Sequence, residues 1–187
     1  MVVDIFNCNN KYDLILADPP WQQKKAGLRN CRPLQGRSLD YKTLDINDIK
    51  RHLETTLQLC GDNVILFLWT IDKYLFEAEA MARELGFKLH ARMIWDKENG
   101  IAPSFDIRYS HEYLLYMYKG KMQKVSIEAR GKIRSVFAEK STRHSKKPIK
   151  SYEIIEELYP DLRKIELYAR YTRSGWDCWG NEIEQEE

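Results

Sequence analysis

Short apolar runs that alternate with amphipathic segments constrain the fold of this 187-residue chain more than any other feature. Residues 12–17 and 64–69 are apolar almost throughout, which is typical of strands buried on both faces of a sheet. From Asp45 to Cys60 apolar side chains recur with the period of a helix, and Gly61 follows as a stop. This alternation predicts an α/β fold with a doubly wound, mostly parallel sheet.

The rest of the chain continues the pattern. Helices are expected over residues 73–85 and 149–158, and Tyr152, Ile155 and Leu158 of the second helix are expected to face the core. Further strands are expected over residues 87–95, 113–118, 135–138 and 164–169, with one antiparallel strand late in the chain and an irregular tail at its end. No repeat or linker divides the sequence, so residues 1–187 are expected to form a single domain.

Composition argues against several classes of protein. The longest apolar runs are much too short to span a bilayer, and the N-terminus lacks a charged segment followed by an apolar one, so neither membrane insertion nor export is indicated. The four histidines show no ligand spacing, and we expect no catalytic metal. The scattered cysteines predict reduced thiols in the cytoplasm rather than disulfides; they are Cys8, Cys31, Cys60 and Cys178.

The tetrapeptide Asp18-Pro19-Pro20-Trp21 directly follows the first predicted strand. The Asp18 carboxylate and the Pro19 carbonyl can accept the two hydrogens of an exocyclic amine on a planar ring, while Trp21 offers a face on which that ring can stack. An Asp-Pro-Pro turn without a chemical role is the alternative. Because ligands of open α/β sheets bind beyond the carboxyl ends of strands, we expect Asp18, Pro19, Pro20 and Trp21 to be catalytic.

Basic residues are concentrated in two segments, although the net charge is only +2. Residues 21–39 contain no acid, and residues 119–150 contain eleven Lys or Arg residues against Glu128 and Glu139. Such segregation predicts a positive face for a phosphate backbone, with solvated loops as the alternative. The candidate contacts to nucleic acid in these segments are Lys24, Lys25, Arg29, Arg32, Arg37 and Arg143, and Arg108 in the predicted loop over residues 97–110 is a further candidate.

Six blocks of residues, in a fixed order, carry a resemblance to a known family. They are LILADPPW (14–21), VILFLWT (64–70), MIWDK (93–97), HEYLLYMYKG (111–120), HSKKP (144–148) and KIELYAR (164–170), before Gly175-Trp176 and Gly180-Asn181-Glu182. In these blocks the chain resembles the MT-A70 family of S-adenosylmethionine-dependent adenine-N6 methyltransferases. The resemblance implies a Rossmann-like class I methyltransferase fold in circularly permuted order, with the amine-binding strand near the N-terminus and the cofactor strand near the C-terminus.

Polar residues around the last predicted strand can bind the ribose hydroxyls and the zwitterionic tail of S-adenosylmethionine. By position in the family pattern, Lys147 and Arg170 would contact the cofactor's carboxylate or ribose, and Asn181 with Glu182 its ribose or adenine. Asp4 and the adjacent Ile5 would correspond to a contact with its adenine. The candidate cofactor residues are Asp4, Ile5, Asp18, Lys147, Glu166, Arg170, Thr172, Arg173, Asn181 and Glu182.

The chain departs from the family pattern at some of these positions. Family members commonly carry Gln or another amide where Glu182 stands, and His-Asn where this chain has Thr172-Arg173. A helix-entry residue is the alternative for Lys147, and a turn is the alternative for Asn181. No G-x-G-x-x-G motif is present, so a dinucleotide cofactor is disfavoured.

The resemblance implies methyl transfer from S-adenosylmethionine to the N6 amine of adenine in nucleic acid, with the base flipped out of a duplex or presented by a single strand. DNA is favoured as the polymer because a compact single domain resembles bacterial and phage enzymes, and RNA is the alternative. The competing functions are a non-catalytic partner subunit and cytosine-N4 methylation. A homodimer and a complex with an MT-A70 partner subunit are the assemblies that the family implies.

Overall fold

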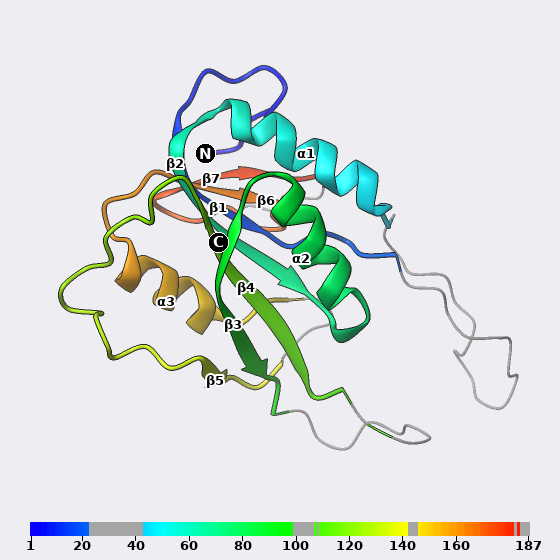
Figure 1. Ribbon diagram of the computed structural model, residues 1–187, viewed down its shortest axis with the longest axis vertical. Helices are drawn as coiled ribbons and strands as arrows, with labels where there is room; N and C mark the ends of the chain where they lie inside the picture. The colour runs from blue at the N-terminus through cyan, green and yellow to red at the C-terminus, as the bar shows by residue number, and fades with distance from the viewer. Residues whose placement is uncertain (23–42, 99–106, 108, 142–145, 182, 184–187) are drawn as a thin grey trace, which may run out of the picture.

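The computed structural model describes residues 1–22, 43–98, 107, 109–141, 146–181 and 183 (Figure 1). Within these ranges seven strands form one sheet in the order β5-β3-β4-β2-β1-β6-β7. The strands are β1 (Tyr12–Ala17), β2 (Cys60–Thr70), β3 (Lys88–Asp96), β4 (His111–Lys119), β5 (Val136–Ala138), β6 (Lys164–Leu167) and β7 (Trp176–Trp179). The helices are α1 (Ile46–Gln58), α2 (Leu75–Glu84), which follows a 3-10 turn (Asp72–Tyr74), and α3 (Ile149–Leu158).

Strand β1 lies inside the sheet, between β2 and β6, and is parallel to both of these neighbours. Its Ile15 pairs with Leu66 of β2 on one side and with Ile165 of β6 on the other. Among the described strands only β4 runs against the rest, since it is antiparallel to both β2 and β3. The predicted fold class, a doubly wound and mostly parallel sheet, is therefore confirmed.

The position of the antiparallel strand differs from the expectation. It was expected late in the chain, but it is β4, near the middle, and the late strands β6 and β7 are parallel to each other. The chain needs no crossover helix to return from β3 to β4, because antiparallel neighbours can be joined by a loop alone.

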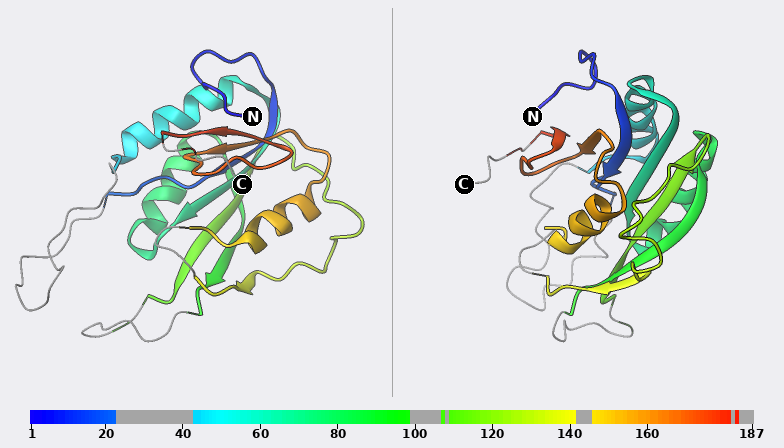
Figure 2. Two further views of the ribbon diagram at one scale, coloured as in Figure 1. Left: turned by 180° about the vertical axis from the view of Figure 1, so that it is seen from behind. Right: turned by 90° about the vertical axis from the view of Figure 1, so that its left-hand side faces the viewer.

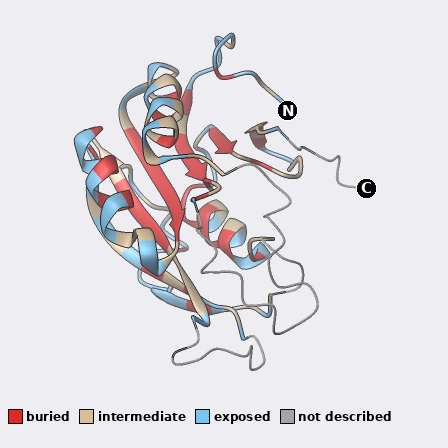
Figure 3. Cartoon of the chain, turned by 90° about the vertical axis from the view of Figure 1, so that its right-hand side faces the viewer, coloured by how far each residue is buried: buried red, intermediate tan, exposed pale blue. Residues whose placement is uncertain are grey.

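Helices cover both faces of the sheet, with α1 and α2 on one side and α3 on the other (Figure 2). Alternate residues of β2 point to these two layers. Leu66 and Leu68 pack with α1 and α2, whereas Phe67 and Trp69 pack with α3. The central strands are buried on both faces, which explains their unbroken apolar runs (Figure 3).

The C-terminal segment, expected to be irregular, contributes β7 at the edge of the sheet. Residues of β7 pair in parallel with β6, and Glu166 lies opposite Cys178. The N-terminal residues cover the outer side of β7, since the Val3 N–H donates to the Cys178 carbonyl (2.9 Å) and the Cys178 N–H donates to the Met1 carbonyl (2.7 Å). A strand of four residues is too short to show a clear alternation in the sequence.

Local signals account well for the helix boundaries. Asp45 caps α1, because its Oδ1 accepts the N–H groups of Asn47 (2.8 Å) and Asp48 (3.0 Å). Helix α3 has the bounds that the sequence predicts, Ile149–Leu158. In the part of the chain that the structure describes, no helix is long and apolar enough to cross a membrane.

Candidate active site

The topology brings charged residues from distant parts of the sequence to the edge of the sheet that is formed by the carboxyl ends of its parallel strands. Parallel strands β1 and β6 both end at this edge, and Asp18 directly follows β1. Because β4 runs the opposite way, its first residues, including Glu112, begin where the parallel strands end. The carboxyl ends of the strands are where open α/β sheets bind ligands.

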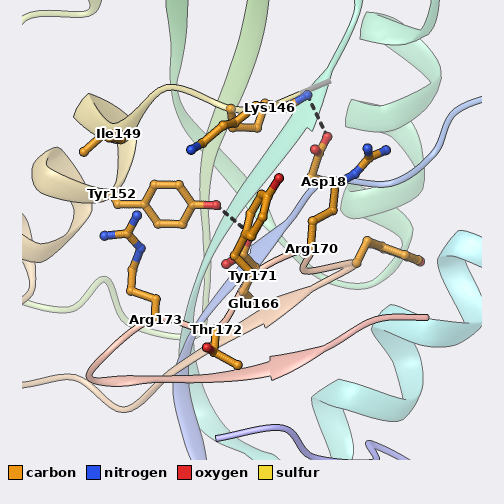
Figure 4. Close-up of a pocket in the computed structure, with 11 residues that line it drawn as sticks. Asp18, Lys146, Ile149, Tyr152, Glu166, Arg170, Tyr171, Thr172 and Arg173 are labelled. Atoms are coloured by element: carbon orange, nitrogen blue, oxygen red, sulfur yellow. Dashed lines mark hydrogen bonds and ion pairs between the residues drawn. The ribbon is translucent and has the colours of Figure 1, made fainter. Parts of the chain in front are cut away.

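A pocket at this edge joins Asp18 to the segment that follows β6 (Figure 4). It lies between β1, β6 and the beginning of α3. Its lining residues are Asp18, Lys146, Lys147, Ile149, Tyr152, Glu166, Tyr168, Arg170, Tyr171, Thr172 and Arg173. The pocket therefore connects the predicted amine-binding carboxylate with the predicted cofactor strand.

The far side of the pocket holds a buried carboxylate, Glu166. The Tyr152 hydroxyl donates a hydrogen bond of 2.7 Å to Glu166 Oε1, and the guanidinium of Arg173 lies 4.0 Å from the centroid of the Tyr152 ring. Burial and the nearby Glu166 charge raise the pKa of Tyr152 well above its ordinary value, so the hydroxyl stays protonated and donates. This pair presents a carboxylate suited to ligand hydroxyl groups.

The near side holds an unbroken row of alternating charges. Lys147 Nζ lies 2.9 Å from Asp18 Oδ1 and 2.9 Å from Glu112 Oε2, while Lys97 Nζ lies 2.5 Å from Glu112 Oε1. Between 80% and 89% of each of the Asp18, Glu112 and Lys147 side chains is covered, because their exposed fractions are 20%, 14% and 11%. Ion pairs covered to this degree are screened far less than surface pairs.

The two carboxylates of this row have opposite pKa shifts. Burial raises the pKa of Asp18, with Glu112 adding to the rise, although Lys147 and Arg170 counteract it. For Glu112 burial acts in the same direction, but the two ammonium groups of Lys147 and Lys97 outweigh it and lower the pKa. Burial lowers the pKa of Lys147, yet its two carboxylate partners outweigh burial and raise it, so the ammonium stays charged.

The start of α3 fixes the position of Lys147. Pro148 occupies the N-cap and provides no side-chain cap, but the Glu139 carboxylate accepts the N–H groups of Ile149 (2.9 Å) and Lys150 (2.8 Å). The Glu139 carbonyl in turn accepts the Trp95 indole N–H at 2.8 Å. A carboxylate at a helix N-terminus satisfies backbone donors and complements the helix dipole.

The two prolines of the tetrapeptide shape a tight turn. The Trp21 N–H donates to the Pro19 carbonyl (2.8 Å), and the Leu44 N–H donates to the Pro20 carbonyl (3.0 Å). A carbonyl oxygen has two lone pairs, so the Pro19 carbonyl keeps the capacity to accept one more hydrogen bond. This geometry is compatible with the predicted grip on an amine.

Trp21 differs from the expectation of an indole that presents a face to the base. Its side chain is 6% exposed, its Nε1–H donates to the Trp69 carbonyl (2.9 Å), and its ring stacks on Tyr74 with centroids 5.3 Å apart. Trp21 does not belong to the lining of the pocket. In this arrangement the ring is part of the core beneath the turn, because Tyr74 already occupies its stacking surface.

The structure brings six of the ten candidate cofactor residues together in the pocket: Asp18, Lys147, Glu166, Arg170, Thr172 and Arg173. Three others lie elsewhere. The Asp4 carboxylate accepts the Phe6 N–H (3.0 Å) and the Asn7 side chain (2.6 Å), Ile5 is in the core, and Asn181 is exposed. Glu182 lies outside the described residues.

All seven candidate nucleic-acid contacts lie outside the described residues; they are Lys24, Lys25, Arg29, Arg32, Arg37, Arg108 and Arg143. The second basic segment is described in part. Its residues 121–134 begin beside the start of β2, where the Lys121 N–H donates to Asn63 Oδ1, and they continue past the C-terminal end of α3, where the Ser126 N–H donates to the Leu158 carbonyl. This part of the segment thus begins at the edge of the sheet opposite Asp18.

Sequence reasoning missed several residues of the site. Lys146, Ile149, Tyr168 and Tyr171 also line the pocket, and their signal was their place beside Lys147 and Arg170 in the motifs. Tyr152 was assigned to the core from its helical spacing, but α3 buries Ser151, Ile154, Ile155 and Leu158 and presents Tyr152 to the pocket. Glu112 stands inside a quoted block, and an acid at the start of an apolar strand was the signal.

The pocket residues offer groups that fit S-adenosylmethionine. The pocket carries four cationic side chains, from Lys146, Lys147, Arg170 and Arg173, which suit a carboxylate, together with Glu166, which suits ribose hydroxyls. Glu166 would repel a phosphate group at the same place. Over the described ranges, no group of three or more His, Cys, Asp or Glu residues could hold a metal ion.

The sheet order and the pocket define the class of this protein, which is a class I methyltransferase that uses S-adenosylmethionine. More particularly, the chain belongs to the MT-A70 family, because the family model matches residues 12–182. The match confirms the resemblance found in the sequence and, with it, the predicted enzyme class, an adenine-N6 methyltransferase of nucleic acid.

Several named proteins are similar to this chain. The type II methyltransferase M.MunI of Mycoplasma sp is 27% identical over an alignment of 187 positions. The alignment covers 92% of this chain and 78% of that protein. The N(6)-adenosine-methyltransferase catalytic subunit METTL3 of Homo sapiens is 26% identical over 183 residues, 93% of this chain and 28% of that protein. A putative N(6)-adenosine-methyltransferase MT-A70-like protein of Medicago truncatula is 26% identical over 183 residues, 92% and 26% respectively. The chain thus spans about a quarter of the human and plant relatives.

Proposed function

We propose that this chain methylates the N6 amine of adenine in DNA, with Asp18 as the acceptor for the amine. The observation that carries the proposal is the pocket that joins Asp18 to Glu166 and the segment after β6. One ligand at each end of such a pocket would place a methyl donor beside an amine. Lys147, Arg170 and Glu166 are proposed to hold the donor, and Asp18 with the Pro19 carbonyl is proposed to hold the base.

The chain's own residues act mainly by positioning and charge. The Asp18 carboxylate and the second lone pair of the Pro19 carbonyl accept the two amine hydrogens, which directs the nitrogen lone pair into the pocket. S-adenosylmethionine supplies a methyl group on a positively charged sulfur when it is bound. As the nitrogen bonds to the methyl group and the bond from that group to sulfur breaks, the nearby Asp18 carboxylate stabilises the positive charge that the nitrogen gains. The proton that the methylated nitrogen then loses passes to Asp18 or to water, so no histidine base is needed.

The proposal of DNA rests on the likeness to the Mycoplasma type II methyltransferase, which is 27% identical and of which the alignment covers 78%. The alignment with the human N(6)-adenosine-methyltransferase subunit covers 28% of that protein. We place it in the cytoplasm, in keeping with the free thiols of Cys8, Cys60 and Cys178. The proposed assemblies are a homodimer and a complex with a second MT-A70 chain. Light scattering of the purified protein measures its molar mass, and twice the mass of the chain would indicate the homodimer.

A methylation assay with labelled cofactor tests the proposal. Single-stranded DNA, duplex DNA and RNA of one sequence are compared, with a matched DNA in which every adenine is replaced by guanine as the control. Digestion and mass spectrometry of the products should yield N6-methyladenine from DNA. Transfer to RNA alone would overturn the choice of polymer, and N4-methylcytosine would overturn the choice of base. Absence of S-adenosylmethionine binding by calorimetry, together with no transfer to any polymer, would instead support a partner subunit.

A further inference from the structure

Glu112 is a charged residue of this edge that the proposed function does not use. It comes from the second position of β4, and its side chain does not belong to the lining of the pocket. Nevertheless it contacts Lys147, which lines the pocket beside Asp18. Through that single ammonium group Glu112 is coupled to the carboxylate that would accept the amine.

Lys147 lies at equal distances from its two acid partners. Its Nζ is 2.9 Å from Asp18 Oδ1 and 2.9 Å from Glu112 Oε2, and it lies 5.2 Å from the centroid of the Trp69 ring. A lysine ammonium has three hydrogens on a compact charge, so it can serve two carboxylates at once. The second acid oxygen of Glu112 is held by Lys97, whose Nζ is 2.5 Å away.

The sharing of the Lys147 ammonium between Asp18 and Glu112 matters because a carboxylate held strongly by an ammonium is a weaker hydrogen-bond acceptor for an amine. An ammonium paired with Asp18 alone would be drawn fully to that carboxylate and would weaken it as an acceptor for a neutral amine. Because Glu112 contacts the same ammonium, the attraction between Lys147 and Asp18 is weaker than it would be in an isolated pair. Lys97 fixes Glu112 in the orientation that makes this sharing possible.

We propose that Glu112 is a positioning residue for methyl transfer, which shares the Lys147 ammonium and so keeps the Asp18 carboxylate available to the incoming amine. The inference rests on the proposed function, since it concerns the residue that would receive the amine. It assigns a role to the first residues of the antiparallel strand β4, whose direction brings Glu112 to the site.

Glu112→Gln is the variant that tests this role, because it keeps the shape of the side chain and removes its charge. We expect kcat to fall by about 10- to 100-fold, while the Kd for S-adenosylmethionine, measured by calorimetry, changes less than threefold. The groups that face Asp18 are Lys147 before α3, Glu112 on β4 and Arg170 after β6, with Tyr152 of α3 nearby. Removing the Glu112 charge removes one cause of the raised Asp18 pKa, so the acid limb of the kcat profile should move to lower pH.

Two matched variants separate charge from structure. Glu112→Asp keeps the charge, and its acid limb should stay with that of the wild type. Glu79→Gln removes a buried carboxylate on α2 that pairs with Arg83 and Arg92 and does not line the pocket, and it should lower the melting temperature without moving the acid limb. The proposal is overturned if Glu112→Gln keeps the wild-type kcat, or if its kcat falls while the acid limb stays in place.

A measurement on the wild-type protein without substrate does not depend on whether a variant folds or on whether the proposed function is correct. Carbon-13 NMR titration of the wild-type side-chain carboxyls should place the Glu112 pKa below its ordinary range and the Asp18 pKa above its own. An ordinary pKa for Glu112 would show that it does not share the ammonium and would overturn the inference. Failure of the wild type to methylate any polymer would contradict the proposed function alone.

Discussion

The Tyr152 hydroxyl and the Glu166 carboxylate meet on one side of the pocket, joined by a hydrogen bond of 2.7 Å (Figure 4). They come from different elements, since Tyr152 is on α3 and Glu166 is on β6. The bond links helix α3, which Lys147 precedes, to the strand that is proposed to hold the cofactor. Loss of either partner should therefore affect binding of S-adenosylmethionine rather than recognition of the amine.

Tyr152→Phe should weaken S-adenosylmethionine binding by about tenfold, because a hydrogen bond to a charged group contributes about 1.5–3 kcal/mol and part of it is recovered by water. Calorimetry with the purified variant measures this. Tyr118→Phe, at the opposite edge of the sheet, is the matched control and should bind like the wild type. Equal affinities of Tyr152→Phe and wild type would show that this bond does not support the cofactor site.

Trp21→Ala should lower the free energy of unfolding by about 3–5 kcal/mol, as expected for a large buried aromatic residue. Trp21 fills the core beneath the turn, bonds to the Trp69 carbonyl and stacks on Tyr74. Urea denaturation measures the effect. A change below about 1 kcal/mol would indicate that the ring is free to leave the core, as the stacking role expected from the sequence requires.

Glu79 provides a test of stability against pH. Burial opposes its ionisation, but hydrogen bonds from Arg83 (2.7 Å) and Arg92 (2.6 Å) outweigh burial and lower the pKa below 4.5. A lowered folded pKa stabilises the native state above the unfolded value and loses that contribution as the pH falls toward the folded value. Glu79→Gln should therefore cost about 1 kcal/mol at pH 7.

The difference between wild type and Glu79→Gln should shrink as the pH falls below 4.5. Denaturant titrations at a series of pH values measure it. A difference that stays constant through that range would mean that the ion pairs of Glu79 do not contribute to the acid stability of the fold.

Gly180→Ala should destabilise the C-terminal part of the sheet by about 1–3 kcal/mol. A β-carbon at Gly180 would lie 2.3 Å from the Ala169 carbonyl oxygen, so the backbone after β6 or β7 would have to shift. Gly61→Ala is the matched control, because its β-carbon would meet nothing within 4 Å. Thermal unfolding of the two variants should separate them, and equal melting temperatures would contradict the close approach.

Much of the fold could be predicted because its signals are local. The apolar runs mark β1, β2 and β4, and the helical spacing with Pro148 at its start gives the bounds of α3. The direction of β4 depends on the loop that returns from β3, and the four residues of β7 depend on pairing with β6, so neither follows from a local pattern. Both are consequences of how the sheet assembles.

The residues of the site likewise fall into those that a local sequence pattern predicts and those that depend on tertiary contacts. The pocket residues Asp18 and Arg170 could be found from the motifs because each directly follows a predicted strand, and Lys147 because it precedes a predicted helix. The contact of Glu112 with Lys147 joins β4 to the segment before α3, and the position of Trp21 depends on Tyr74. Tyr168, just after β6, adopts a left-handed backbone with φ of 63°, a conformation that tyrosine rarely takes and that no sequence pattern announced.

The central claim is that the Asp18 carboxylate receives the amine, and Asp18→Asn tests it most directly, since the side chain keeps its shape while one oxygen becomes a donor. Single-turnover transfer of labelled methyl to an adenine-containing oligonucleotide should be slower than in the wild type by about 10³-fold or more. Binding of S-adenosylmethionine should remain within a few fold. An Asp18→Asn enzyme that transfers the methyl group at nearly the wild-type rate would contradict the account.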